Sequence, residues 1–391
     1  MDFNKLNYDM KKNKNIIVNK INYMTEDKRS IRIKSAVIRF KRGLSVVLAS
    51  AMLLSFLSGC GTKEESTEST ANKQELITVG FSQLGAESDW RVANTESIKN
   101  SLTRQNGFEL MFDDAQQKQD KQLLAIRNFT QQEVDCIVLA PVMETGWDTV
   151  LQEAKDAEIP VIVVDRQVKV TDTALVTAWI GSDFSKEAKI ACEWLKSYTE
   201  AKGIKPEELN IVDIQGTLGA TAQIGRSNGL MESCGKNGWN LIAQVPADYT
   251  QAKGKEVMQN LLADHDDINV VYCENDNEAI GAIEAIEEAG KKAGTDIQNG
   301  EILIISFDAA HSGLSKVLEG KIALDVECNP LQGEELERIV KAVHEGTEYN
   351  KYTYVKEKAF ALDDTVTTVK LDDEEYEITI LDQNLLDRRE Y

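Results

Sequence analysis

The chain has 391 residues, of which 42 % are hydrophobic and 28 % charged, a balance typical of a globular protein with a sizeable core. Its formal net charge is -21, which disfavours the phosphate backbone of nucleic acid as a partner because like charges repel. The length favours two domains or a bilobal unit.

The N-terminal region is basic although the chain as a whole is acidic. Residues 1–59 contain twelve Lys and Arg against four Asp and Glu. An apolar run of 15 residues follows the last basic residues, at 43–57. It is shorter than the ~20 residues of a membrane span and fits the hydrophobic region of a signal peptide. The run ends in Leu-Ser-Gly-Cys at 57–60, which resembles the bacterial lipobox and predicts Cys60 as the lipidated residue.

The segment after the lipobox is rich in Ser, Thr and Glu and has no apolar periodicity. This composition is typical of a solvated tether, which we place at 60–75. We therefore expect 1–59 to be a lipoprotein signal region. The mature protein would be anchored on the outer face of the cytoplasmic membrane, which is the periplasmic side where an outer membrane exists. Met1 and Met24 both remain open as the translation start.

From residue 76 onward, short apolar runs alternate with amphipathic stretches. The runs are rich in Val and Ile and apolar on both faces, as expected of central parallel strands, and the stretches between them are typical of helices. The runs lie at 76–81, 108–112, 135–141, 159–165, 177–181, 209–216, 241–246, 268–273, 301–308 and 322–327, and a final strand is expected at 376–381. This alternation predicts an α/β fold with doubly wound parallel sheets.

Ten such runs are more strands than a single open sheet usually holds, so the sequence favours two lobes. The first change of lobe is expected near Asp183, after the fifth run. We expect a first lobe at 76–183, completed by about 328–360, and a second at 184–327, completed by about 361–391. No Gly/Ser-rich linker lies between them, which favours short hinge strands.

Polar side chains follow six of the runs, from both expected lobes. Ligands of open parallel sheets bind beyond the carboxyl ends of the strands, so these side chains are candidates for a binding site. Planar Asp, Arg and Asn groups suit the hydroxyls of a sugar, and an aromatic ring suits its C–H face. The candidates are Glu87, Trp90, Arg91, Asp165, Arg166, Arg226, Tyr249, Asn275, Asp308 and Glu327.

Five of these residues also have purely structural interpretations. Asp165 and Arg166 could form a surface turn, Asn275 could cap a helix, Trp90 could belong to the core, and Arg226 could be a solvated helix residue. Their shared placement at strand ends favours the binding site.

The cysteines do not indicate a metal site. Apart from Cys60, they show neither a CxxC pair nor a Cys/His cluster, so we expect no zinc, no other metal and no cofactor. Five is an odd number, which excludes complete pairing and leaves a single disulfide open. These residues are Cys136, Cys192, Cys234, Cys273 and Cys328.

Several segments together resemble a known family. The sequences ITVGFSQLGAESDWR, KDAEIPVIVVDR, QGTLGATAQIGR and ENDNEAIGAIEAIEEAG occur in this order within about 76–346. They are similar to the pentose- and hexose-binding class of periplasmic binding proteins, and most of all to galactofuranose-binding receptors. The resemblance implies a type I periplasmic binding protein fold, with two Rossmann-like lobes, three hinge crossovers and one sugar in the cleft.

Carried over by motif, the resemblance implies that the ten candidates above hold the sugar, with Glu327 at the hinge. It further implies a monomeric receptor that delivers a monosaccharide, galactofuranose or a related aldose, to the permease and ATPase of an ABC importer. Ala140 stands before Pro141, where ribose binders place an Asn, which argues against ribose. The extended C-terminal segment departs from the family pattern.

Three other functions were weighed. No GxSxG, P-loop or metal-spacing motif supports an enzyme. A related repressor would carry a DNA-binding helix-turn-helix where this chain has a signal region. A receptor that feeds a sensor kinase or chemoreceptor stays open as the alternative, because the receptor sequence does not separate transport from sensing.

Overall fold

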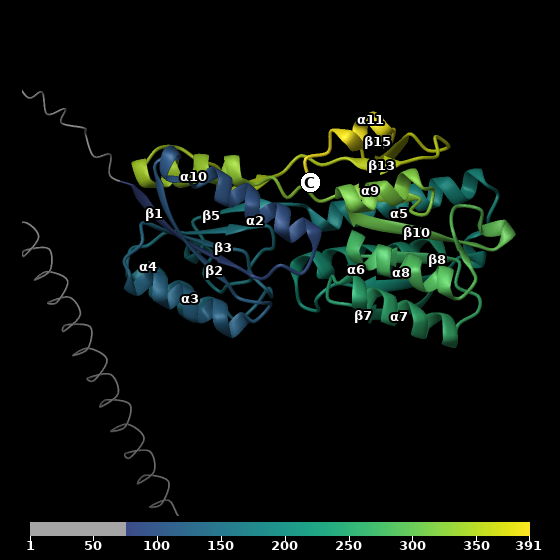
Figure 1. The fold of residues 1–391 in the computed structure, drawn as a ribbon, viewed down its shortest axis with the longest axis horizontal. Helices are drawn as coiled ribbons and strands as arrows, with labels where there is room; N and C mark the ends of the chain where they lie inside the picture. Colours follow the sequence, from purple (N-terminus) through teal and green to yellow (C-terminus); the bar gives the residue numbers. More distant parts are fainter. Residues whose placement is uncertain (1–75) are drawn as a thin grey trace, which may run out of the picture. The chain divides into compact units, whose positions relative to one another are not determined.

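The computed structural model describes residues 76–391, which fold around two β-sheets (Figure 1). The predicted signal region 1–59, the lipidation site Cys60 and the tether 60–75 lie outside the described residues. In the described part of the chain, no helix is both long and apolar enough to cross a membrane.

The first sheet has six strands, and every neighbouring pair in it is parallel. Its central strands are apolar and buried on both faces, as the Val- and Ile-rich runs predict. In sheet order the strands are β12 (Tyr352–Tyr354), β5 (Ala178–Gly181), β4 (Val161–Val164), β3 (Cys136–Leu139), β1 (Ile77–Gln83) and β2 (Phe108–Asp114).

Two helices cover each face of this sheet, so that each face has its own apolar core. On one face, residues such as Ile98 and Leu336 bury α2 and α10 against the strands. On the other, Phe129 and Leu151 do the same for α3 and α4. The helices are α2 (Asp89–Ser101), α3 (Gln119–Gln131), α4 (Asp148–Asp156) and α10 (Gly333–Glu345).

The second sheet has nine strands and a parallel centre. Its C-terminal part is mixed, because β13 is antiparallel to β11 and β14 is antiparallel to β15. In sheet order the strands are β14 (Thr368–Leu371), β15 (Glu374–Ile380), β13 (Ala359–Ala361), β11 (Leu324–Glu327), β10 (Glu301–Asp308), β8 (Val270–Cys273), β6 (Asn210–Gln215) and β7 (Asn240–Pro246), with β9 (Lys292–Ala293) beside β10.

This sheet is also covered on both faces. Trp194 and Leu230 bury α5 and α6 on one face, and Met258, Ile286 and Val317 bury α7, α8 and α9 on the other. The helices are α5 (Phe184–Ala201), α6 (Thr221–Asn237), α7 (Gln251–Asp264), α8 (Asp276–Glu288), α9 (His311–Leu318) and the short α11 (Gln383–Asp387).

The chain passes between the two sheets three times. The first crossing follows β5 at 182–183, the second follows β11 at 328–332, and the third joins β12 to β13 at 355–358. We refer to the part built on the first sheet as the first lobe and to the part built on the second as the second lobe.

The predicted fold class is confirmed, since the chain forms two mainly parallel, helix-covered sheets joined by three crossings. The strands β9, β12, β13 and β14 were not predicted. They are short, and β12 is the alternating sequence Tyr-Thr-Tyr at a sheet edge, so none produces a long apolar run. In the described part of the chain the five cysteines are buried free thiols.

Candidate functional site

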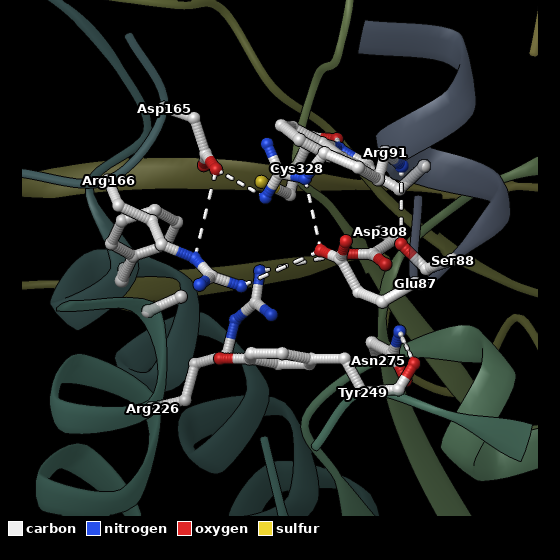
Figure 2. Close-up of a pocket in the computed structure, with 13 residues that line it drawn as sticks. Glu87, Ser88, Arg91, Asp165, Arg166, Arg226, Tyr249, Asn275, Asp308 and Cys328 are labelled. Carbon is white, nitrogen blue, oxygen red and sulfur yellow. Dashed lines mark hydrogen bonds and ion pairs between the residues drawn. The ribbon is translucent and has the colours of Figure 1, made fainter. Parts of the chain in front are cut away.

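A pocket lies where the carboxyl ends of strands from both lobes face each other (Figure 2). The space in it that protein atoms do not fill, including space open to solvent, is about 290 Å³. In each sheet the strand order reverses beside the first strand of the lobe, which is where open α/β sheets bind ligands. The pocket is lined by Glu87, Ser88, Trp90, Arg91, Asp165, Arg166, Phe184, Ala222, Arg226, Tyr249, Asn275, Asp308 and Cys328.

The first lobe supplies its pocket residues from two strand ends. After β1, the side chain of Ser88 accepts a hydrogen bond from the backbone N–H of Arg91 at 3.2 Å and so caps α2. This cap places Trp90 and Arg91 in the first turn of the helix. After β4, Asp165 adopts a left-handed backbone (φ 62°), and its N–H donates to the carbonyl of Ile180 at 2.8 Å.

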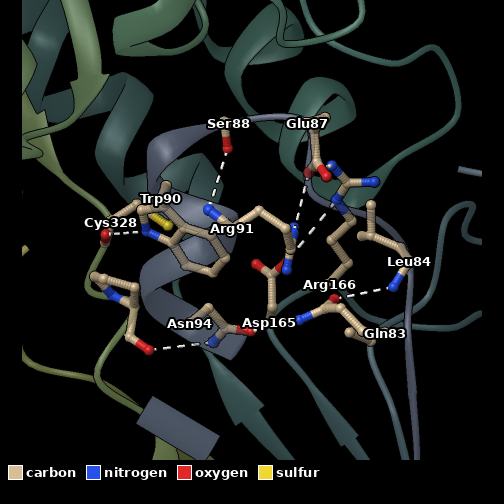
Figure 3. A network of polar contacts seen from close by, with 12 residues as sticks. Gln83, Leu84, Glu87, Ser88, Trp90, Arg91, Asn94, Asp165, Arg166 and Cys328 are labelled. Carbon is tan, nitrogen blue, oxygen red and sulfur yellow. Dashed lines mark hydrogen bonds and ion pairs between the residues drawn. The ribbon is translucent and has the colours of Figure 1, made fainter. Parts of the chain in front are cut away.

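Four charged side chains of the first lobe form one buried network (Figure 3). The guanidinium of Arg91 lies 3.0 Å from Glu87 and 2.7 Å from Asp165. Arg166 lies 3.8 Å from Glu87 and 3.9 Å from Asp165, and it donates to the carbonyl of Val142 at 3.0 Å. Burial opposes the charge of Arg91, but Asp165 and Glu87 outweigh it and raise the pKa of Arg91 above its usual value. Arg91 is therefore held as a cation in the pocket wall.

The second lobe has its own buried cation in Arg226. Its Nε donates to Glu187 at 2.8 Å, its Nη1 donates to the carbonyl of Glu274, and its Nη2 lies 3.7 Å from Asp308. The guanidinium carbon also lies 4.7 Å from the ring centre of Phe307. Burial raises the pKa of Asp308 well above its usual value, while Arg226 opposes this change.

Asn275 has a structural role as well as a place in the pocket wall. Its side-chain oxygen accepts from the N–H of Glu278 at 2.9 Å and caps α8, and its amide donates to the carbonyl of Tyr249 at 3.2 Å. The helix-cap interpretation of Asn275 is thus correct. The cap also positions the aromatic ring of Tyr249, which stands 5.1 Å from the guanidinium carbon of Arg166 in the other lobe.

Asp308 is held at the end of β10 by an unusual backbone. Asp308 and Ala309 both have positive φ, at 103° and 50°. Such conformations cost about 1–3 kcal/mol each and persist where the surroundings hold them. The N–H of Ala309 donates to Asp325 at 3.0 Å, and the next N–H, of Ala310, donates to Asp276 at 2.8 Å. These two buried carboxylates fix the loop that presents Asp308.

Four polar atoms of the pocket residues are buried and have no hydrogen-bond partner in the described part of the chain: Glu87 Oε2, Arg91 Nη1, Arg226 Nη2 and Tyr249 OH. A buried polar group without a partner costs about 1–3 kcal/mol, so native proteins rarely keep several in one place without a purpose. The four include an acceptor, two donors and a hydroxyl that can do both. Two come from each lobe, so a ligand that satisfies all four must contact both.

An apolar cluster adjoins these polar atoms. Trp90, Phe184, Tyr249 and Cys328 pack together with two alanines, and they come from both lobes and from the second crossing. The indole N–H of Trp90 donates to the carbonyl of Cys328, so its edge is satisfied and its apolar face remains for packing.

The rim of the pocket is closed by hydrogen bonds between the lobes. Asp89 accepts from the hydroxyl of Ser312 at 2.9 Å, and its N–H donates to Asn277 at 3.2 Å. On another side, the N–H of Gln167 donates to the hydroxyl of Thr221 at 2.9 Å. The described structure therefore has the two lobes in contact around the pocket.

Nine of the ten predicted residues line this one pocket. Glu327 does not. Its Oε1 accepts from Arg389 Nη1 at 2.8 Å and from Tyr391 OH at 2.7 Å, and its Oε2 accepts from the N–H of Lys358 at 2.8 Å. Its carboxylate is thus engaged by the C-terminus and the third crossing instead of facing the pocket.

The sequence reasoning missed four lining residues: Ser88, Phe184, Ala222 and Cys328. Ser88 had a detectable signal, because a Ser before Asp-Trp-Arg is a typical helix cap. Phe184 and Cys328 lie at the crossings, and neither is itself a polar residue at the end of an apolar run. Glu187, which supports Arg226 from behind, was also missed.

Three residues, one from each crossing, contact one another beside the pocket. The hydroxyl of Ser182 lies 3.3 Å from the thiol of Cys328 and donates to Glu357. Glu357 also accepts from the N–H of Asn329 at 3.2 Å. Burial raises the pKa of Glu357 well above its usual value. This hinge cluster, Ser182, Cys328 and Glu357, ties the three crossings together beside the pocket.

Two lobes that close on a pocket at the ends of parallel strands define the periplasmic-binding-protein architecture. The sequence model of the periplasmic binding protein domain family matches residues 79–348, and the chain belongs to this family. Galactofuranose-binding protein YtfQ of Escherichia coli strain K12 is 39 % identical over 293 residues, which cover 73 % of this chain and 88 % of that protein.

Two solved structures are similarly close. A protein from Mycobacterium smegmatis in complex with β-D-fucofuranose is 43 % identical with a TM-score of 0.69, covering 74 % of this chain and 92 % of that one. The periplasmic binding component of an arabinose ABC transporter from Shewanella sp. ANA-3, bound to L-arabinofuranose, is 39 % identical with a TM-score of 0.67, covering 72 % of this chain and 91 % of that one.

Proposed function

We propose that this protein is the lipid-anchored, extracytoplasmic receptor of an ABC importer and that it binds a monosaccharide in the furanose form, galactofuranose or a related aldose. The observation that carries the proposal is the set of four buried polar atoms, two from each lobe, that have no hydrogen-bond partner within residues 76–391. A sugar hydroxyl both donates and accepts, so neighbouring hydroxyls on one ring match a set of mixed donors and acceptors.

The walls of the pocket support a sugar ring as the ligand. The faces of Trp90 and Tyr249 offer apolar surface to the C–H groups of the ring, while the charged networks address its hydroxyls. Arg91 and Arg226 are held by carboxylates and Arg166 by the carbonyl of Val142, so these donors are already oriented before the ligand arrives.

The relatives support the furanose ring. The names of the three compared proteins specify galactofuranose, β-D-fucofuranose and L-arabinofuranose, which share the five-membered ring and differ in their substituents. The family and the predicted lipid anchor at Cys60 both support a role in import. An anchored receptor stays near its permease, and closure around the sugar gives the permease a loaded shape to recognise.

The direct test is a thermal-shift screen of residues 61–391 against D-galactose, D-fucose, L-arabinose, D-ribose and D-glucose. A ligand at 100-fold its Kd should stabilise the folded protein by about 2.7 kcal/mol. We expect D-galactose, D-fucose or L-arabinose to raise the Tm and D-ribose not to. Nuclear magnetic resonance of the ¹³C-labelled sugar in the complex should then show the furanose ring. A bound pyranose, or no shift with any aldose, would contradict the proposal.

The transport role has a separate test. The sugar-loaded receptor should stimulate ATP hydrolysis by the reconstituted permease and ATPase encoded beside it, whereas the sugar-free receptor should not. Stimulation of a sensor kinase in place of the ATPase would assign the receptor to signalling.

A further inference from the structure

The C-terminus of the chain returns to the hinge (Figure 1). The short helix α11 buries Leu386 in the core of the second lobe and packs against α9. The last three residues, 389–391, then run beside the ends of β10 and β11, which lead to the pocket and to the second crossing. We call these three residues the C-terminal strap.

The strap makes specific polar contacts with the loop after Asp308. Arg389 Nε donates to the carbonyl of Ala309 at 2.8 Å, and the carbonyl of Tyr391 accepts from the N–H of His311 at 2.7 Å. The side chain of Arg389 is only 12 % exposed and stacks 4.0 Å over the ring of Tyr391. These contacts hold the same loop whose Ala309 N–H donates to Asp325.

The same two side chains also hold the second crossing. Both Arg389 and Tyr391 donate to Oε1 of Glu327, the last residue of β11. The next residue, Cys328, lines the pocket, and its N–H donates to the carbonyl of Asp308 at 3.4 Å. The strap therefore braces two neighbouring segments of the pocket wall at once.

We propose that Arg389 and Tyr391 are positioning residues of the ligand pocket, which hold Asp308 and Cys328 in the geometry that binds the ligand. The physical reason is the positive φ of Asp308 and Ala309, a conformation that persists only where several contacts hold it. Without the strap the loop relaxes, and only a fraction of molecules presents Asp308 correctly. The apparent affinity falls by that fraction. This deepens the proposed function, since the ligand is the monosaccharide named there.

The first experiment needs no ligand. Amide hydrogen exchange is measured at Ala309, Ala310 and His311 in the wild-type chain, in Arg389→Gln and in Arg388→Gln. Arg388 is the matched control, because it is exposed and its side chain donates to the carbonyl of Asn384 in the preceding helix. We expect exchange at these amides to rise in Arg389→Gln alone. Equal protection in all three proteins would overturn the proposal.

The second experiment measures affinity for D-galactose and L-arabinose. Arg389→Gln should weaken binding about tenfold, and the milder Tyr391→Phe, which removes one hydroxyl, should weaken it less. In an Asp308→Ala background, Arg389→Gln should cost less than in the wild type, because part of the strap's effect acts through Asp308. Fully additive losses, or an Arg389→Gln affinity equal to that of Arg388→Gln, would overturn the proposal. If the wild type binds neither sugar, the proposed function fails. The exchange experiment alone then tests whether the strap holds the loop after Asp308.

Discussion

Arg226 and Glu187 form a buried ion pair, with Nε and Oε2 2.8 Å apart, that joins the pocket to the first crossing. Arg226 lines the pocket, and Glu187 lies in the first turn of α5, four residues after Asp183. The other oxygen of Glu187 is buried and has no hydrogen-bond partner within the described residues 76–391. The orientation of Arg226 thus depends on a residue that the sequence reasoning did not single out.

Replacing Glu187 with Gln should weaken sugar binding by about 1–3 kcal/mol, because Arg226 loses the charged half of a buried hydrogen bond. The affinity is measured by isothermal titration. Glu200→Gln is the control, since it lies on the same helix and pairs with Lys196 on the surface. Equal affinities of the two variants would show that Glu187 does not orient Arg226.

Arg166→Ala should cost at least about 2 kcal/mol of binding, the order expected when buried partners lose their hydrogen bonds. Glu87, Asp165 and the ring of Tyr249 all lose a cation with this change. The matched control is Arg127→Ala, which removes a half-exposed pair with Glu153 far from the pocket. Folding is checked by circular dichroism, and wild-type affinity in Arg166→Ala would remove this residue from the site.

The rim hydrogen bonds should stabilise the closed form. The double variant Thr221→Ala/Ser312→Ala removes one contact on each side and should weaken binding about tenfold, mainly through faster dissociation. Ser315→Ala, whose hydroxyl bonds within its own helix, should leave the rate unchanged. In small-angle scattering, saturating sugar should lower the radius of gyration of the wild type and lower it less in the double variant. An unchanged wild-type profile would show that binding does not require closure.

The stability of the sugar-free protein should fall as pH rises from about 4 to 7. Burial raises the pKa of Asp325 to about 7, while its hydrogen bond with Asp276 opposes the change. The folded protein therefore keeps a proton that the unfolded chain has released, and the stabilisation present below the unfolded pKa is lost as pH passes the folded pKa. Denaturant unfolding at pH 5 and pH 8 measures this.

Asp325→Asn should reduce that pH dependence, because an amide can accept from Ala309 and donate to Asp276 without titrating. Asp387→Asn, a change at an exposed position, serves as the control. If Asp325→Asn lost as much stability between pH 5 and pH 8 as the wild type does, Asp325 would be excluded as a source of the pH dependence.

The anchor is tested by Cys60→Ser. The change should leave an uncleaved precursor or release the protein to the soluble fraction, because the acyl chains supply ~0.8 kcal/mol of membrane affinity per buried CH₂. Fractionation and mass spectrometry of the mature N-terminus measure the outcome. Normal processing with unchanged membrane retention would show that Cys60 is not the lipidation site.

The sequence alone determined the two-sheet α/β fold and most of the pocket. Val- and Ile-rich runs such as 159–165 specify buried strands, and parallel strands bring their carboxyl ends to one edge. Polar residues directly after such runs, such as Asp165 and Asp308, could therefore be assigned to a common site before any coordinates were known. The short edge strands lacked this signal, because β12 contributes only three alternating residues.

Only the tertiary structure decided which polar groups remain available to a ligand. Glu327 follows a strand like the other candidates, yet Arg389 and Tyr391, more than 60 residues later, engage its carboxylate. Conversely, Phe184 and Cys328 enter the pocket because the crossings pass beside it. Strand periodicity is local and can be read along the chain. The partner of a buried charge depends on which distant segment packs beside it, and only the folded structure determines that.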